Sequence, residues 1–213
     1  MSEDKESFSM GSFWKTNLPT RNILVIILIV HIVLWIITLS MGNIVTFRDA
    51  ISINYEILST VGQYNFLVFQ GHIYQLVTSI FVHVDLLHLL SNCLFLLVFG
   101  FKAEERLLSW QYYFVFIFSG IMGGLLSFVY GPYSISAGAS GGVFGLLGAA
   151  LALMYQHEKT KSFWGYLASG GIFFLIMSFG SPNVNFFAHA IGLVTGAVIP
   201  FILKKRRQTA IVT

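Results

Sequence analysis

Three short polar motifs interrupt a chain that is otherwise strongly apolar. Ser140 lies in the run GASGG at 138–142, His189 stands in a second apolar stretch, and His88 and Asn92 lie four residues apart in a third. A serine becomes a nucleophile when a neighbouring histidine takes its proton. Imidazole and amide groups can donate hydrogen bonds to the oxyanion that then forms. These residue types are therefore those of acyl transfer.

The composition of the 213 residues indicates which class of protein carries these motifs. Hydrophobic residues make up 56% and charged residues 10%, with a mean hydropathy of +0.78, whereas soluble domains have about 45–50% and 25%. So few charges could not cover a soluble surface, so we predict an integral membrane protein. Disordered, collagen-like, disulfide-stapled and ordinary cytosolic proteins are excluded. The one cysteine, Cys93, excludes an internal disulfide and any cysteine-based zinc or iron–sulfur site.

Six apolar segments are long enough to cross a bilayer, which takes roughly 20 helical residues, and none contains Asp, Glu, Lys or Arg. Continuous apolar runs favour helices over the alternating strands of a membrane barrel. The sequence therefore predicts an all-α bundle of six spans in one membrane domain, 22–203, with short tails at 1–21 and 204–213. The predicted spans are 22–41, 86–101, 111–130, 140–156, 163–179 and 186–203.

The basic residues give the orientation of this bundle. Of the 12 Lys and Arg residues, only Arg48 falls on the side of the segment 42–85, and the other eleven fall on the side of both tails. The positive-inside rule makes that second side cytoplasmic. The segment 42–85 is rich in aromatic residues, so we expect it to be partly helical and to lie in the outer membrane interface.

Small residues predict which spans touch. Glycines recur along one side of two spans, Gly141, Gly145 and Gly148 in one and Gly192 and Gly196 in the other. Small residues allow helices to approach closely in lipid, so we expect this contact to bring Ser140 near His189. The alternative is that the glycines serve packing alone.

The same inventory limits the other kinds of site. All nine acidic residues lie outside the spans, and Asp85 alone could reach the site, so we predict a Ser–His pair without an acid. No H-E-x-x-H motif and no paired aspartates within spans occur, which excludes zinc and aspartyl intramembrane proteases. A metal site of His83, His88 and His189 is disfavoured because no carboxylate or thiolate joins them. We expect no cofactor, and no nucleic-acid partner because no basic face exists.

These motifs, in this order, resemble the rhomboid intramembrane serine proteases. The resemblance runs from about Gly71 to Gly196. Its motifs are Gly138-Ala139-Ser140-Gly141 running into Val143-Phe144-Gly145, His83-x-x-x-x-His88-x-x-x-Asn92, Glu104-x-Arg106, and Ala188-His189-x-x-Gly192-x-x-x-Gly196. The segment before the second span departs from the family, since it reads Tyr74-Gln75 where many members have Trp-Arg.

The resemblance implies a role for each matching residue. Ser140 would be the nucleophile, His189 the general base, and His88 and Asn92 the side chains of the oxyanion hole. Three more motif residues, Gly138, Gly141 and His83, would support the site, and Phe144 would pack against the catalytic imidazole.

The function expected from the sequence is hydrolysis of peptide bonds in or beside transmembrane segments. The resemblance suggests single-span substrates with small residues before the cut, and a multi-pass protein of a bacterial plasma membrane in contact with its lipids. The active site would open to the extracytoplasmic side. One alternative is an inactive rhomboid-like protein that binds membrane clients, although such relatives typically lack the serine or the histidine. The other alternative is a transporter or channel. The absence of charged residues from the spans argues against it.

Overall fold

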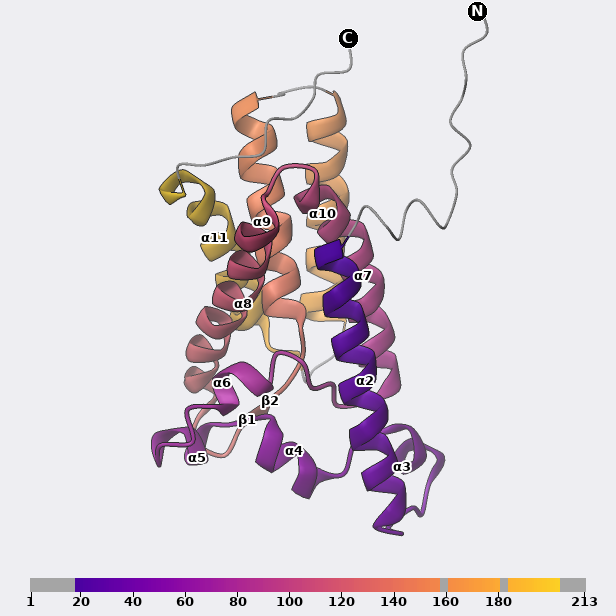
Figure 1. Ribbon diagram of the computed structural model, residues 1–213. Coiled ribbons are helices and arrows are strands. Elements are labelled where there is room, and N and C mark those ends of the chain that lie inside the picture. Colours follow the sequence, from indigo (N-terminus) through magenta and orange to yellow (C-terminus); the bar gives the residue numbers. More distant parts are fainter. Residues whose placement is uncertain (1–17, 158–160, 181–183, 204–213) are drawn as a thin grey trace, which may run out of the picture.

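The computed structural model describes residues 18–157, 161–180 and 184–203, and its longer helices form an upright bundle (Figure 1). The predicted tail 204–213, and all but four residues of the predicted tail 1–21, lie outside the described residues. The long helices are α2 (Leu18–Ser40), α7 (Leu86–Glu104), α8 (Ser109–Leu126), α9 (Ser140–His157), α10 (Lys161–Phe179) and α11 (Phe186–Ile202).

Each predicted span coincides with one of these helices. Within the described residues, four helical stretches are long and apolar enough to cross a membrane, namely Leu18–Ser40, Leu86–Glu104, Ser109–Tyr130 and Lys161–Phe179. Two more apolar helices are shorter, Ser140–Gln156 and Phe186–Ile202. The outward faces of the bundle are apolar too, as at Ile29 of α2 and Ile172 of α10, which are 56% and 58% exposed. An apolar exterior of this kind suits lipid, so the chain is a multi-pass membrane protein.

Helix α9 forms the centre of the bundle. It contacts α7, α8, α10 and α11, and every residue from 141 to 150 is buried. This stretch consists of glycine, alanine and aliphatic or aromatic residues, so it is apolar on every side, as a fully surrounded helix must be.

The contact between α9 and α11 is made backbone against backbone. A Cβ atom at any of three glycines would overlap a carbonyl of the facing helix: Gly192 against Gly141, Gly196 against Gly145, and Gly148 against Leu193. Only hydrogen fits at these positions, so the two helices approach as the glycine spacing predicts.

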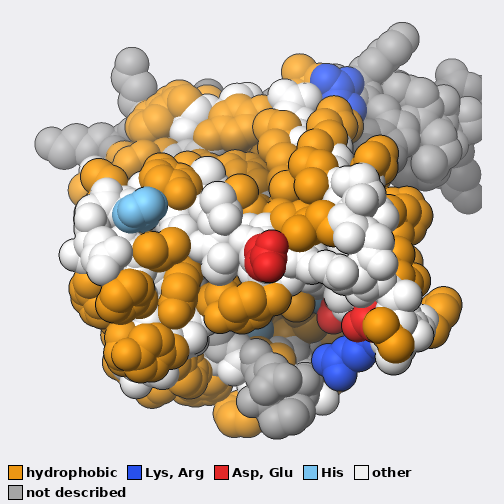
Figure 2. All heavy atoms as spheres, turned by 90° about the horizontal axis from the view of Figure 1, so that it is seen from below, with side chains coloured by type: hydrophobic (Ala, Val, Ile, Leu, Met, Phe, Trp, Pro, Cys, Tyr) orange, Lys and Arg blue, Asp and Glu red, His pale blue; other side chains and the backbone are white. Residues whose placement is uncertain are grey.

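Short elements fill one end of the bundle, which we call the loop end (Figure 1). They are α3 (Phe47–Ile51), α4 (Tyr55–Val61), β1 (Gln63–Tyr64), α5 (Asn65–Phe69), α6 (Gln75–Thr78), the 3-10 helix η1 (Ser127–Tyr130) and β2 (Ile135–Ser136). Strands β1 and β2 pair antiparallel, with Gln63 opposite Ser136. The predicted segment 42–85 is thus partly helical. Hydrophobic side chains cover much of the loop end, with few charges among them (Figure 2).

Buried amides fasten the loop end together. Gln75 is fully buried; its Oε1 accepts from the Tyr64 N–H at 2.9 Å, and its Nε2 donates to the carbonyls of Ser59 and Thr60 at 2.9 and 3.0 Å. An amide can accept and donate at once. The neutral side chain of Gln75 therefore satisfies backbone groups of both α4 and β1.

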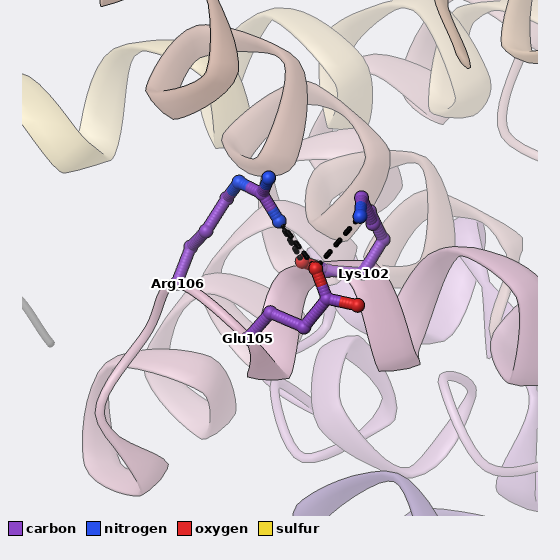
Figure 3. A network of polar contacts seen from close by, with 3 residues as sticks. All are labelled: Lys102, Glu105 and Arg106. Atoms are coloured by element: carbon purple, nitrogen blue, oxygen red, sulfur yellow. Dashed lines mark hydrogen bonds and ion pairs between the residues drawn. The ribbon is translucent and has the colours of Figure 1, made fainter. Parts of the chain in front are cut away.

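A polar cluster joins the helices at the opposite end. The hydroxyl of Thr20 donates to Glu104 at 2.7 Å and lies 2.8 Å from the hydroxyl of Tyr112, and all three residues are buried. In the adjoining turn, Glu105 accepts from Lys102 and Arg106, each at 2.7 Å (Figure 3). The contacts of Thr20 join α2, α7 and α8 beside the turn from α7 into α8.

The glycine contact predicts the effect of a larger side chain between α9 and α11. We expect Gly196→Val to lower the free energy of unfolding by about 2–3 kcal/mol, because the new methyl groups must push the Gly145 backbone away. Gly171→Val on α10 is the control, since nothing lies within 4 Å of its Cβ position. SDS titration in mixed micelles, followed by circular dichroism, measures both; equal stabilities would contradict the close contact.

The cluster around Glu104 predicts the effect of removing one donor. We expect Thr20→Val to destabilise the protein by about 1–3 kcal/mol, because the buried carboxylate loses a hydrogen bond and gains no water. Thr60→Val is the matched control, because Thr60 is exposed and its hydroxyl donates to the Glu56 carbonyl of its own helix. We expect a change within about 0.5 kcal/mol. The same titration compares them, and an unchanged Thr20→Val would refute a structural role for this bond.

Candidate active site

Ser140 stands at the first turn of the central helix because of the glycine two residues before it. Gly138 has a φ of +136°, a value that residues with a side chain rarely adopt. A Cβ atom there would also lie 2.7 Å from Cε1 of His88. The N–H of Gly138 donates to the Ser79 carbonyl at 2.9 Å, which ties the segment to the loop end. The chain can therefore enter α9 directly beside His88.

His189 faces Ser140 from α11. Its Nε2 lies 2.9 Å from the Ser140 Oγ, and the two residues are only 3% and 8% exposed. Gly192, one turn after His189, touches the Gly141 carbonyl, so the backbones are close enough for the two short side chains to meet. The structure thus brings together the two residues that the sequence predicts as nucleophile and base.

Two further residues hold the His189 ring and its helix in place. The ring of Phe144 lies against the imidazole, with centroids 4.7 Å apart and planes tilted by 44°. Asn185 begins α11: its Oδ1 accepts from the Ala188 N–H at 2.9 Å, and its Nδ2 donates to Ser136 of β2 at 3.1 Å. The start of α11 is therefore anchored to the loop end.

The second nitrogen of His189 has a partner that the sequence analysis missed. The Oγ of Ser178, in the last turn of α10, lies 3.0 Å from Nδ1, and Ser178 is buried. The prediction of a Ser–His pair without an acid depended on the positions of the carboxylates alone. A serine close to the outer end of an apolar span was a usable signal, but its pairing with His189 depends on how α10 and α11 pack.

His88 and Asn92 differ in how they meet the site. His88 lines the cavity in front of Ser140. Asn92 is buried and is not part of the cavity lining; its Nδ2 donates to the His88 carbonyl at 2.9 Å, and its Oδ1 has no hydrogen-bond partner among the described residues. One N–H of the Asn92 amide is thus engaged within its own helix, and the second remains for other contacts.

His83 lies beneath the site and is fully buried. Its Nε2 accepts from the Ala139 N–H at 3.4 Å, and its ring meets that of His88 with centroids 5.2 Å apart. Burial, with His88 and His31 nearby, lowers the pKa of His83 well below its ordinary value, so the ring is neutral. It supports both the start of α9 and the ring of His88.

Asp85, the one acid that could have reached the site, serves its own helix. Its Oδ1 accepts from the His88 N–H at 2.8 Å and caps α7, which is a common role for an aspartate before a helix. Within the described residues, no group of three His, Cys, Asp or Glu side chains is placed to hold a metal ion.

A cavity of about 530 Å³ opens onto the hydroxyl and the imidazole. Its polar lining includes His88, Ser136 and Asn185, and its apolar wall comes from α7, from α10 and from the residue before Asn185: Leu87, Ile176, Met177 and Val184. A hydroxyl in contact with an imidazole at the edge of such a cavity can attack a carbonyl carbon brought into it.

Comparison with known proteins places the chain in a family. The family model described as Rhomboid domain matches residues 70–206. YdcA of Bacillus subtilis is named as a rhomboid protease. It is 30% identical to this chain over 190 residues, which are 85% of this chain and 88% of YdcA.

Two longer relatives match this chain over part of their own length. Rhomboid protease GluP of Bacillus subtilis is 34% identical over 150 residues, which are 68% of this chain and 29% of GluP. RHOMBOID-like protein 1 of Arabidopsis thaliana is 31% identical over 145 residues, 67% of this chain and 37% of that protein. The chain thus spans well under half of these two relatives. The domain match and the likeness to YdcA along most of both chains show that this protein belongs to the rhomboid family.

Proposed function

We propose that this protein is an intramembrane serine endopeptidase in which Ser140 and His189 form the catalytic pair. The observation that carries the proposal is the 2.9 Å contact between Ser140 Oγ and His189 Nε2 at the edge of the cavity. Membership of a family whose relatives are named as proteases supports the same reading.

The reaction follows from this geometry. Ser140 Oγ attacks the carbonyl carbon of the scissile peptide bond while its proton passes to His189 Nε2. The tetrahedral intermediate collapses, the C–N bond breaks, and the leaving amine takes the proton from Nε2. Water then attacks the acyl-enzyme and gives a proton to His189 Nε2. The second tetrahedral intermediate collapses, the bond between the acyl carbon and Ser140 Oγ breaks, and Oγ takes the proton back from Nε2.

Donors for the oxyanion come from two sources. The first N–H groups of a helix have no partner within it, and Ser140 and Gly141 are the first residues of α9. His88 lines the same cavity. Asn92 lies one turn further along α7, outside that lining, and its bond to the His88 carbonyl leaves one N–H of its amide for the oxyanion. We assign these groups to the developing negative charge, which a helix N-terminus also favours.

The length of α9 bears on how deep Ser140 lies in the membrane and so on its access to water. Its 18 residues rise about 27 Å, slightly less than a hydrocarbon core of about 30 Å. If α9 spans the membrane, Ser140 at its end lies near or below the membrane surface, where the cavity can admit both water and an extended peptide.

The cavity walls suit a membrane-protein substrate. Leu87, Ile176 and Met177 present apolar surface beside the polar floor. We propose single-span proteins as substrates, with small residues before the cut and segments that unwind readily, because a peptide bond inside a helix is inaccessible to Ser140.

The proposed setting is the plasma membrane of a bacterium, with lipids around the apolar faces of α2 and α10. By the order of the predicted spans, Arg48 is the one basic residue on the side of the segment 42–85, against eleven on the other side. The positive-inside rule then places both termini in the cytoplasm and opens the site to the extracytoplasmic side.

Replacing the nucleophile is the direct test. We expect Ser140→Ala to abolish both fluorophosphonate labelling and cleavage of a single-span substrate in liposomes, because no other hydroxyl contacts His189 Nε2 among the described residues. Ser169→Ala is the control: Ser169 is outside the cavity lining, and its hydroxyl donates to the Tyr166 carbonyl within α10. Folded wild type without labelling would refute the pair and favour an inactive, client-binding rhomboid-like protein.

If His88 donates to the oxyanion, its removal should lower the rate of cleavage while Ser140 remains in place as the nucleophile. We expect His88→Ala to lower kcat by about 10²-fold or more, the usual effect of removing one such donor. His72→Ala, an exposed histidine of the loop end, is expected to match wild type. Steady-state cleavage assays with both variants measure this, and a His88→Ala enzyme with wild-type kcat would exclude His88 from the oxyanion hole.

A further inference from the structure

Ser178 is a buried polar residue on the most exposed of the long helices. Only 17% of the membrane-crossing window of α10 is buried, and the buried residues of this helix are Phe163, Gly170 and Ser178. A hydroxyl buried among apolar groups is costly unless it has a hydrogen-bond partner. The partner of Ser178 is Nδ1 of His189, at 3.0 Å.

We propose that Ser178 is a positioning residue that orients His189 for catalysis, an inference that rests on the proposed protease function. Its Oγ accepts the hydrogen of Nδ1 and so leaves Nε2 unprotonated, at 2.9 Å from the nucleophile. The three side chains then form a chain of hydrogen bonds from Ser178 through His189 to Ser140.

The contact between Ser178 and Nδ1 determines which tautomer of the His189 imidazole is favoured. A neutral imidazole carries one hydrogen, and only the form with that hydrogen on Nδ1 can take the proton of Ser140 at Nε2. During the reaction His189 becomes an imidazolium, and both nitrogens then donate. The Ser178 oxygen can accept from Nδ1 in both states, so this hydrogen stays on Nδ1 throughout the cycle.

No described carboxylate takes this place. Asp85 is the acid that lines the cavity, and it is engaged with the His88 N–H at the start of α7. A hydroxyl, unlike a carboxylate, can also donate, so Ser178 selects the productive tautomer less strongly than an acid would. The expected contribution is that of one ordinary hydrogen bond, about threefold to tenfold in rate.

The same turn of α10 forms part of the cavity wall. Met177 and Gly180 line the cavity on either side of Ser178 in sequence, while Ser178 itself contacts the base. Part of the wall that a substrate meets and the group that orients His189 are therefore neighbours in sequence at the end of α10.

The test compares variants of Ser178 with a serine elsewhere on α10. Ser178→Ala removes the acceptor, Ser178→Cys keeps the size with a weak acceptor, and Ser178→Thr restores the hydroxyl. Ser169→Ala is the matched control, because the Ser169 hydroxyl donates to the Tyr166 carbonyl within α10. Purified full-length proteins in liposomes are assayed for kcat, KM and the rate of fluorophosphonate labelling.

We expect Ser178→Ala to lower kcat and the labelling rate about threefold to tenfold with KM within twofold. Ser178→Cys is expected to lie between Ser178→Ala and wild type, and Ser178→Thr and Ser169→Ala within twofold of wild type. A structural role alone would not produce this split between kcat and KM together with rescue by threonine. Wild-type kcat in Ser178→Ala, or a change confined to KM, would overturn the inference.

Nitrogen-15 NMR of the His189 ring gives a readout that does not require turnover. We expect a protonated Nδ1 and an unprotonated Nε2 in the wild type, and a mixture of tautomers in Ser178→Ala. Identical ring signals in the two proteins would overturn the inference while leaving the protease function intact. Folded wild type that neither labels nor cleaves would overturn both.

Discussion

The close approach of α9 and α11 is the contact on which the rest of the site depends. Within lipid no hydrophobic force draws one apolar helix to another, so packing and hydrogen bonds must do so. The glycines of the two helices place backbone against backbone, with Gly192 and Gly196 touching the carbonyls of Gly141 and Gly145. The short side chains of a serine and a histidine can meet only across such a narrow gap.

Neutral amide side chains hydrogen-bond the segments of the loop end to one another. Gln75 bonds to three backbone groups, and Gln63 and Asn65 donate to the carbonyls of Gly124 and Ser127 near the end of α8. Asn185 connects the start of α11 to β2. Amides suit this region because they satisfy donors and acceptors without the cost of removing a charge from water.

The proposed catalytic pair likewise has a neutral partner instead of a charged one. A carboxylate behind His189 would have to be buried between α10 and α11, where an ionised group is costly. Ser178 offers an acceptor to Nδ1 at 3.0 Å without that charge. The proposed arrangement exchanges some control over the tautomer for a site that stays neutral until the reaction itself creates an imidazolium and an oxyanion.

The sequence alone determined the class of fold and the residue types of the site. Apolar runs without charges predicted membrane helices at six places where the structure has helices, and the spacing of small residues predicted that α9 and α11 touch. Both patterns are local, because the periodicity of a helix decides which residues share one of its faces. The resemblance to rhomboids came from short motifs of the same local kind.

The tertiary structure decided which faces meet. The rotation of α10 turns Ser178 toward His189, the packing of the loop end buries Gln75, and the bond from Asn185 Nδ2 to Ser136 joins the start of α11 to β2. None of these pairings follows from the spacing of residues along one helix. They depend on the relative rotation and depth of neighbouring helices, which the packing of all the helices sets together.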